Sequence, residues 1–230
     1  MGGRRRYRVL RLARAAVSGK FKILFSQFGE DALVYRHFPK GFVGTYLDIG
    51  AYHPFKFSNT ARLWTMGWNG VNVDANKSSV ALFDRIRPND VNIWAAVVPQ
   101  MERDRSETVA FSAGDGISAI GHIVDLGTAG LQVPAISLKD LCRHFQRPVD
   151  FMNIDIEGLD EAIIGDEAFR ALAPRLLAIE QYGEDLAEIL RRPSTALLTD
   201  LGYSLVSRCE LTSLFLRKDV SPTTPARALP

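Results

Sequence analysis

The stretch that decides the fold is Thr45-Tyr-Leu-Asp-Ile-Gly-Ala-Tyr-His-Pro54. An apolar run with aromatic and β-branched residues ends in an acid, and a glycine and a His-Pro turn follow. This pattern is typical of a buried strand that ends at a ligand-facing loop. A second run, Gly70-Val-Asn-Val-Asp-Ala-Asn76, ends in another acid about 25 residues later, the separation expected of an acid that binds a ribose. The two runs together predict a nucleoside cofactor.

Length and composition indicate one α/β domain, which we expect over residues 23–220. The chain has 230 residues, 47% of them hydrophobic, and can bury one sizeable core. Its net charge of +2 does not indicate a nucleic-acid partner. Cys142 and Cys209 lie far apart without metal-ligand spacing, which favours a reduced, cytoplasmic setting. No run approaches the roughly 20 apolar residues that a membrane span needs.

The two ends of the chain differ in composition from the rest. Residues 1–22 carry eight basic residues and no acid. Such an arm is either solvated or forms a basic helix that contacts anionic lipid at a membrane surface; the solvated form is the commoner one. Residues 221–230 contain three prolines, and we expect this tail to be disordered.

Strand-like and helix-like segments alternate along most of the chain. The predicted strands are Thr45–Ile49, Val71–Val73, Val91–Val97, Val149–Ile154 and Leu176–Ile179. The predicted helices are Gly29–Phe38, Asn59–Met66, Ser79–Ile86, Leu138–Phe145, Leu159–Leu172 and Glu184–Leu201. Strands separated by helices pair in parallel through right-handed crossovers, so the pattern predicts a doubly wound sheet.

The last part of the chain breaks this alternation. Tyr203–Arg208 and Ser213–Arg217 are strand-like, and the link between them is too short for a crossover, so they must pair antiparallel if they pair directly. A mostly parallel sheet that ends in an antiparallel hairpin suits a methyltransferase-type sheet better than a dinucleotide-binding one. Between Pro99 and Pro134 only Thr108–Phe111 is strand-like; we interpret the region around Gly114–Gly121 as a lid or an acceptor-binding segment, or else as a surface excursion.

Four predicted strands end in an acid, namely Asp48, Asp74, Asp155 and Glu180. In open α/β sheets ligands bind outside the carboxyl ends of the strands. Carboxylates gathered there need hydroxyl or cationic ligands or a metal, although some of them can cap the following helices instead. A carboxylate at Asp74 can accept both hydroxyls of a ribose, and Gly50 allows the backbone to approach a ligand closely.

Several nucleotide-binding and hydrolytic motifs are absent from the sequence. Gly50 is followed by Ala51, Tyr52 and His53, so no Gly-x-Gly-x-x-Gly fingerprint is present at the first crossover. A Walker-type loop and a Gly-x-Ser-x-Gly elbow are absent too. These absences argue against a pyrophosphate ligand and against serine hydrolysis.

A set of motifs in fixed order resembles the FkbM-like branch of class I S-adenosylmethionine-dependent methyltransferases. The motifs are Ser26-Gln-Phe-Gly-Glu-Asp31, Tyr46-Leu-Asp-Ile-Gly-Ala-Tyr-His-Pro54, Ser58-Asn-Thr60, Gly67-Trp-Asn-Gly70, Asn153-Ile-Asp-Ile-Glu-Gly158 and Ala178-Ile-Glu180. The resemblance implies a seven-stranded class I sheet, S-adenosylmethionine as cofactor and methyl transfer to a hydroxyl oxygen. It implies a small-molecule, sugar, glycolipid or related natural-product acceptor.

The resemblance also implies roles for individual residues. Asp48 and Gly50 would flank the methionine end of the cofactor, and Asp74 would hold the ribose. Ala75 and Asn76 would lie near the adenosine. Asn59 would contact the cofactor or the acceptor, or belong to a plain helix cap.

Some relatives are similar to metal-dependent enzymes, with ligands at the ends of the fourth and fifth strands. The matching residues here are Asp155, Glu180 and Gln181, oxygen donors that suit Mg²⁺. Gln181 stands where a second acid would be expected, so the sequence leaves the metal open. The candidates for the base that takes the proton of the acceptor hydroxyl are His53, Asp155 if no metal is bound, and His122. Glu180 is the further catalytic candidate.

Two other functions are consistent with the sequence. An NAD-dependent oxidoreductase would also use Asp74 on a ribose, although the missing glycine fingerprint and the terminal hairpin argue against it. The other is a non-catalytic relative that binds a cofactor or a partner without turnover, because no single residue stands out as the base.

Overall fold

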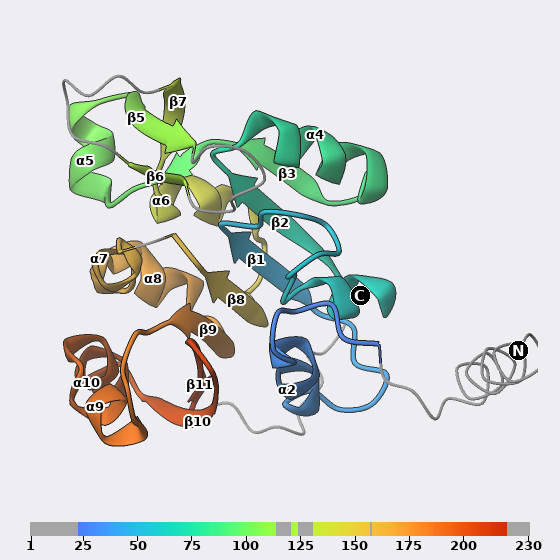
Figure 1. The fold of residues 1–230 in the computed structure, drawn as a ribbon, viewed down its shortest axis with the longest axis vertical. Helices are drawn as coiled ribbons and strands as arrows, with labels where there is room; N and C mark the ends of the chain where they lie inside the picture. The colour runs from blue at the N-terminus through green and yellow to red at the C-terminus, as the bar shows by residue number, and fades with distance from the viewer. Residues whose placement is uncertain (1–22, 114–120, 124–130, 157, 220–230) are drawn as a thin grey trace, which may run out of the picture.

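The computed structural model describes residues 23–113, 121–123, 131–156 and 158–219. The expected basic arm (1–22), most of the expected lid (114–120) and the expected tail (221–230) lie outside these residues. The described chain forms a seven-stranded sheet, a smaller four-stranded sheet and the helices that cover them (Figure 1).

The seven-stranded sheet has the strand order β10-β11-β9-β8-β1-β2-β3. Its strands are β1 (Thr45–Ile49), β2 (Asn69–Asp74), β3 (Val91–Trp94), β8 (Phe151–Ile154), β9 (Leu176–Glu180), β10 (Tyr203–Cys209) and β11 (Thr212–Arg217). The five strands from β3 to β9 pair in parallel, while β11 pairs antiparallel with both β9 and β10. This confirms the predicted mostly parallel class I sheet with its C-terminal antiparallel hairpin.

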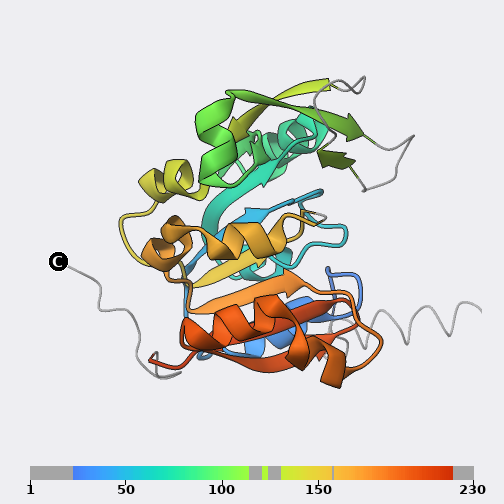
Figure 2. The same cartoon turned by 90° about the vertical axis from the view of Figure 1, so that its left-hand side faces the viewer.

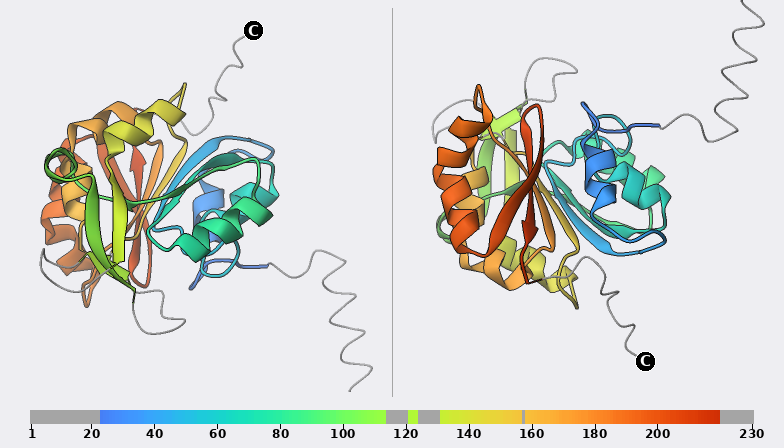
Figure 3. Two further views of the ribbon diagram at one scale, coloured as in Figure 1. Left: turned by 90° about the horizontal axis from the view of Figure 1, so that it is seen from above. Right: turned by 90° about the horizontal axis from the view of Figure 1, so that it is seen from below.

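Helices cover both faces of this sheet (Figure 3). One face carries α2 (Glu30–Arg36), α3 (Ala61–Thr65) and α4 (Lys77–Ile86). The other carries α6 (Leu138–Leu141), α7 (Asp160–Gly165), α8 (Glu167–Leu172), α9 (Leu186–Arg191) and α10 (Pro193–Asp200). Among the described residues, no helix has the length and apolar character needed to cross a bilayer.

The central strand β1 contributes to the cores on both faces. Successive side chains of a strand point to opposite faces. Leu47 and Ile49 pack with α6, α7 and α8, whereas Tyr46 packs with α2 and α3. Asp48 lies on the same face as Tyr46 and is 1% exposed. A carboxylate therefore lies inside the molecule, and its partners decide what it does.

The second sheet was not predicted from the sequence. It has the order β4-β7-β5-β6 and consists of β4 (Ala96–Val97), β5 (Thr108–Ala113), β6 (Gly121–Ile123) and β7 (Leu131–Ile136), with α5 (Gln100–Arg105) beside it. Figures 1 and 2 show it at the opposite end of the molecule from the β10–β11 hairpin. The run Val91–Val97, predicted as one strand, is divided between the two sheets after Trp94. Short strands rich in small residues carry weak propensity, and pairing distant in sequence stabilises them here.

Three predicted helices are interrupted. The segment Glu184–Leu201 breaks between α9 and α10 because Arg192 precedes Pro193 and is extended (φ −65°, ψ 143°), as residues before proline prefer. The segment Leu159–Leu172 breaks at Asp166, whose carboxylate accepts a hydrogen bond from the Gln100 backbone N–H at 2.9 Å. The segment Leu138–Phe145 continues beyond α6 as a 3-10 turn, η1 (Cys142–His144).

Candidate functional site

Three of the four predicted strand-end acids lie at one edge of the main sheet. Asp74 is the last residue of β2, Glu180 is the last residue of β9, and Asp155 directly follows β8. Because β2, β1, β8 and β9 are parallel neighbours, their carboxyl ends meet at the same edge. Asp155 is exposed, while Asp74 and Glu180 are half-buried. This edge is therefore the candidate site.

Asp74 is held by backbone groups on both sides. Its Oδ2 accepts a hydrogen bond from the Tyr52 N–H at 2.7 Å, and its Oδ1 accepts one from the Asn76 N–H at 2.7 Å. Burial raises the pKa of this carboxyl, and the two backbone hydrogen bonds act in the opposite direction. Each carboxylate oxygen has two lone pairs, so each can also accept a hydrogen bond from a ligand hydroxyl. Asp74 thus presents a fixed pair of acceptors.

Asp48, in contrast, does not reach the surface of the site. Its carboxylate accepts hydrogen bonds from Thr60 Oγ1 at 2.6 Å and from Asn153 Nδ2 at 3.0 Å. Asn59 Nδ2 donates in turn to Asn153 Oδ1 at 2.9 Å. Burial raises the pKa of Asp48, and the Thr60 hydroxyl opposes that rise. Asp48 therefore connects the start of α3 to β8 and positions these two elements relative to β1.

Gly50 is needed for contact between two loops. It has φ +77°, and a Cβ built on it would lie 1.9 Å from the carbonyl oxygen of Asp155. Its N–H donates to the Val73 carbonyl at 3.0 Å. Only glycine combines this left-handed backbone with such a close approach. The sequence suggested an approach to a ligand, whereas the structure shows an approach to the loop that follows β8.

A buried polar network that the sequence analysis missed lies under the loop between β1 and α3. Arg87, which is fully buried, donates to Thr60 Oγ1 at 2.9 Å, to Ser58 Oγ at 3.2 Å and to the Pro54 carbonyl. The Tyr46 hydroxyl donates to Asp90 Oδ2, and Arg87 donates to the same hydroxyl at 3.3 Å. The network fixes the loop from beneath.

One sequence signal could have indicated this network. Asn72 lies in the middle of the apolar run of β2, where a buried amide requires hydrogen-bond partners. Its Nδ2 donates to Asp90 Oδ2 at 3.0 Å and to Asn92 Oδ1 at 2.8 Å. Asn72, Asp48 and Asn153 are also register partners across β2, β1 and β8, so the polar row is continuous.

His53 accepts two backbone hydrogen bonds. Its Nδ1 accepts from the N–H groups of Phe55 and Lys56, both at 3.0 Å. Burial lowers the pKa of His53, and the charges of Lys56 and Arg87 lower it further. The neutral ring consequently carries its proton on Nε2, because the lone pair of Nδ1 is engaged. In this geometry the ring can donate a hydrogen bond, and it does not suit the predicted role of base.

The predicted magnesium ligands do not come together. Gln181 is 2% exposed, and its Nε2 donates to Ser194 Oγ at 2.8 Å and to Thr195 Oγ1 at 3.2 Å on α10. Because successive side chains alternate, Gln181 faces away from Glu180. Among the described residues, no group of three or more His, Cys, Asp or Glu is placed to hold a metal ion. Of the predicted donor set Asp155, Glu180 and Gln181, the structure therefore directs Gln181 away from the other two residues.

Ala75 and Asn76 lie beside Asp74 at the start of α4. The Ala75 carbonyl accepts a hydrogen bond from Trp94 Nε1 at 2.9 Å. Asn76 is exposed and caps α4, because its Oδ1 accepts from the Ser78 N–H at 2.9 Å. Their backbone is thus held next to the acceptor pair of Asp74.

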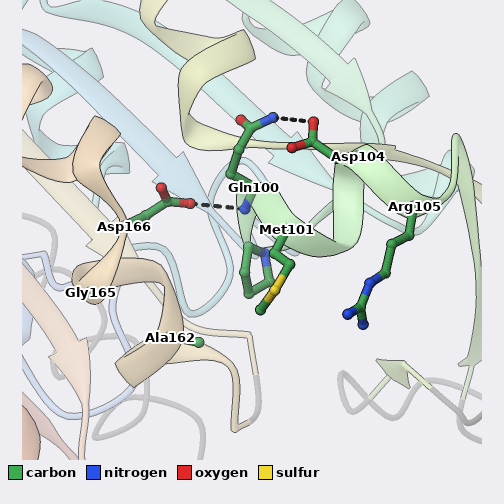
Figure 4. Close-up of a pocket in the computed structure, with 8 residues that line it drawn as sticks. Gln100, Met101, Asp104, Arg105, Ala162, Gly165 and Asp166 are labelled. Atoms are coloured by element: carbon green, nitrogen blue, oxygen red, sulfur yellow. Dashed lines mark hydrogen bonds between the residues drawn. The ribbon is translucent and has the colours of Figure 1, made fainter.

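A separate cavity lies between α5 and α7 and has a volume of about 620 Å³ (Figure 4). It is lined by Pro99, Gln100, Met101, Asp104, Arg105, Ala162, Gly165 and Asp166. None of the strand-end acids lines it.

Comparison with known proteins places the chain in a family. The model of the methyltransferase FkbM domain matches residues 48–205, more than half of the chain. No curated protein gave a significant match. Eleven chains of solved structures match as well, among them three at low identity.

The first of these structures is a methyltransferase FkbM from Methylobacillus flagellatus KT, with 14% identity and a TM-score of 0.46, covering 76% of this chain. The chain spans only 43% of the length of that protein. The second is a TehB-like SAM-dependent methyltransferase from Corynebacterium glutamicum, with 13% identity, a TM-score of 0.44 and coverage of 93% and 97% of the two chains.

The third is the 1,6-didemethyltoxoflavin-N1-methyltransferase of Burkholderia thailandensis, solved with 1,6-didemethyltoxoflavin and S-adenosylhomocysteine. It has 12% identity and a TM-score of 0.44 and covers 81% of this chain and 74% of its own. These likenesses are too distant to assign a ligand or a substrate. The family assignment rests on the domain match: the chain belongs to the FkbM methyltransferase family.

Proposed function

We propose that this chain binds S-adenosylmethionine at the carboxyl ends of β1 and β2 and transfers a methyl group to a hydroxyl oxygen of a sugar, glycolipid or related natural product. The observation that carries the proposal is Asp74. Its two carboxylate oxygens are fixed by backbone N–H groups at the end of β2, where class I enzymes of this strand order hold a ribose. Family membership supplies the reaction class.

The residues present suit the cofactor. Asp74 would accept hydrogen bonds from both ribose hydroxyls, and the backbone at Ala75 and Asn76 would lie along the adenosine. The loop after Gly50 would border the methionine end of the cofactor, and Asn59 would lie near it. The buried Asp48 would hold the loop and Asn59 in place through its hydrogen bonds to Thr60 and Asn153. When bound, S-adenosylmethionine supplies a methyl group on a positively charged sulfur, already a good electrophile.

The chain must then orient the acceptor and manage one proton. The acceptor oxygen has to be aligned with the methyl group, and its proton leaves as the new bond forms. Asp155 is exposed at the edge of the sheet and is our candidate for accepting that proton on a carboxylate oxygen. Glu180, at the end of the neighbouring strand β9, is the candidate for holding the acceptor hydroxyl. His53 would act as a hydrogen-bond donor through Nε2.

Calorimetry tests the cofactor assignment. S-adenosylmethionine should bind to the full chain, NAD should not, and Asp74→Asn should weaken S-adenosylmethionine binding by about tenfold or more, since one charge-assisted acceptor is lost. Asp84→Asn is the matched control, because Asp84 is an exposed acid on α4. Unchanged affinity in Asp74→Asn, or preferential binding of NAD, would refute the assignment.

A screen with a labelled methyl donor tests the reaction. Sugars, lipid-linked saccharides and hydroxylated natural products would be offered, and formation of S-adenosylhomocysteine would be measured. Turnover should fall about 100-fold or more in Asp155→Asn, the range expected for removing a general base. Cofactor binding without turnover on any acceptor would favour the non-catalytic alternative instead.

A further inference from the structure

The loop between β1 and α3 holds two aromatic residues in an uncommon backbone conformation. Tyr52 has φ +54° and Phe57 has φ +56°. Bulky L-residues rarely adopt this left-handed region, because Cβ comes close to the following carbonyl oxygen. The loop keeps both residues in this conformation where glycine would be relaxed. This is a strong local conflict between side chain and backbone, and such conflicts concentrate at functional sites.

The rings of the two residues stack on each other, with Phe57 exposed at the surface. The ring centroids are 6.2 Å apart and the ring planes differ by 14°. Phe57 is 47% exposed, although burial would be the usual fate of such a side chain. The Lys56 Nζ lies 4.8 Å from the Phe57 centroid and 5.8 Å from the Tyr52 centroid. We call Tyr52, Lys56 and Phe57 the aromatic platform.

The platform is attached to the candidate cofactor site. The backbone N–H of Tyr52 donates directly to Asp74 Oδ2. Beneath the loop, Arg87 donates to the Pro54 carbonyl and to Ser58 Oγ, and the Ser58 N–H donates to the Phe25 carbonyl at 3.1 Å. The aromatic platform is therefore a preformed surface next to Asp74, the acid that we propose binds the ribose.

Lys56 supplies positive charge to this surface. Its Nζ donates to the Tyr52 hydroxyl at 3.4 Å, and an ammonium carries three donors in all. Within the described part of the chain, no carboxylate lies at ion-pair distance from Lys56. A ligand anion can therefore pair with this ammonium while an apolar face of the ligand rests on the exposed part of the Phe57 ring.

We propose that the aromatic platform binds the methyl acceptor, and that this acceptor carries a sugar ring with an anionic group such as a phosphate or a carboxylate. The inference rests on the proposed function, which it deepens. The C–H groups on one face of a sugar ring are slightly positive and suit the negative face of an aromatic ring. The anionic group would pair with the Lys56 ammonium, which the two rings already hold in place.

Binding of simple probes to the full chain tests the proposal without the true acceptor. Glucose 6-phosphate, glucuronate, glucose and inorganic phosphate would be titrated in the presence of S-adenosylhomocysteine and followed by saturation-transfer NMR. The two anionic sugars should bind more tightly than glucose or phosphate. Lys56→Met, which keeps the apolar stem, should remove the preference for the anionic sugars over glucose.

Phe57→Gly is the decisive variant because it removes the ring and also relieves the left-handed backbone. The fold should not lose stability, so weaker binding cannot be ascribed to unfolding. Binding of all the sugars should weaken by about tenfold, equivalent to about 1.4 kcal/mol. Leu190→Ala, at a residue that is 55% exposed on α9, is the control and should bind as the unaltered chain does.

The outcomes separate this inference from the proposed function. If S-adenosylmethionine affinity stays unchanged in Phe57→Gly while sugar binding falls, the platform serves the acceptor. If cofactor affinity falls instead, the platform serves the cofactor and the inference is wrong. Equal binding of glucose and glucose 6-phosphate, or absence of sugar binding, also overturns it. Failure of S-adenosylmethionine to bind the unaltered chain refutes the proposed function, while the sugar titrations are read independently.

Discussion

At the scale of single residues, the candidate site depends on groups that are fixed by backbone contacts. Asp74 accepts two backbone N–H groups and keeps acceptor capacity on both oxygens. Gly50 lets the loop after β1 pass the Asp155 carbonyl. The Nδ1 lone pair of His53 accepts two backbone hydrogen bonds, so this residue does not suit the role of base that the usual pKa of histidine suggested. In each case local hydrogen bonding decides what the residue can do.

Gly50→Ala is expected to destabilise the protein strongly. The left-handed backbone costs about 1–2 kcal/mol for a residue with a Cβ. Here that Cβ would also lie 1.9 Å from the Asp155 carbonyl oxygen, so overpacking adds about 1–3 kcal/mol. Gly67→Ala is the matched control, because Gly67 has φ +91° with no atom within 4 Å of the added Cβ, and it should show the backbone cost alone. Urea unfolding measures both; equal losses would contradict the close approach.

Cofactor affinity is expected to fall as the solution is made more acid. Burial raises the pKa of Asp74 above the ordinary aspartate value of about 3.9. In its proposed role the Asp74 carboxylate would accept the ribose hydroxyls fully only when ionised, so affinity should be full above the raised pKa and decline as pH falls through it. Calorimetry at a series of pH values measures the decline. Asp74→Asn should bind weakly with little pH dependence, and an unaltered pH profile in that variant would assign the decline to another group.

At the scale of elements, hydrogen bonds from a buried arginine hold together the end of β1, the loop that follows it and the start of α3. Arg87 follows α4 and reaches the loop between β1 and α3 through three of its residues, Pro54, Ser58 and Thr60. Thr60 passes the connection on to Asp48 of β1. The carboxyl end of β1 and the start of α3 therefore form one unit.

Arg87→Lys is expected to destabilise the protein by about 2–4 kcal/mol. The planar guanidinium of arginine reaches several acceptors at once, whereas a single ammonium cannot satisfy all of them. Some acceptors would therefore be left buried without a hydrogen-bond partner. Chemical denaturation measures the loss. Arg85→Lys is the control, since Arg85 is exposed on the same helix and should change stability by less than about 0.5 kcal/mol. Similar losses in both variants would argue against the network.

At the scale of the whole molecule, the strand order brings acids from distant segments of the chain to one edge of the main sheet. A residue that is adjacent to one of these acids in the sequence is nevertheless directed elsewhere. Asp74 and Glu180 are separated by about a hundred residues, and both end strands of the same parallel sheet. Gln181 directly follows Glu180 and is directed to α10 on the opposite face. The three-residue magnesium set that the family resemblance implied is therefore not assembled.

Methyl transfer is expected to be insensitive to chelators. Gln181 is engaged with α10, so the three predicted ligands do not form one set, and treatment with EDTA should leave cofactor affinity and turnover within about twofold, less than 0.5 kcal/mol. The measurement is labelled methyl incorporation on an acceptor found in the screen, before and after dialysis. Loss of turnover that added Mg²⁺ restores would show that the metal site forms in another way.

The sequence by itself determined the alternation of strands and helices, the C-terminal hairpin, the acids at the strand ends and the family motifs. These depend on patterns within short segments, such as the apolar run before Asp48 or the short link after Tyr203–Arg208. Even the break before Pro193 follows a local steric rule, although the sequence analysis overlooked it. Such local patterns can be predicted from the sequence because each depends only on neighbouring residues.

Only the tertiary structure decided which of these residues share a surface. It buried Asp48 beneath Thr60 and Asn153, placed Gln181 on the far face, and paired β4–β7 into a second sheet that weak local propensity concealed. The physical reason is that burial and hydrogen-bond partners come from segments distant in the chain. Arg87 shows this most clearly: in the sequence it is an ordinary basic residue at the end of a helix, and in the fold it holds the loop that borders the site.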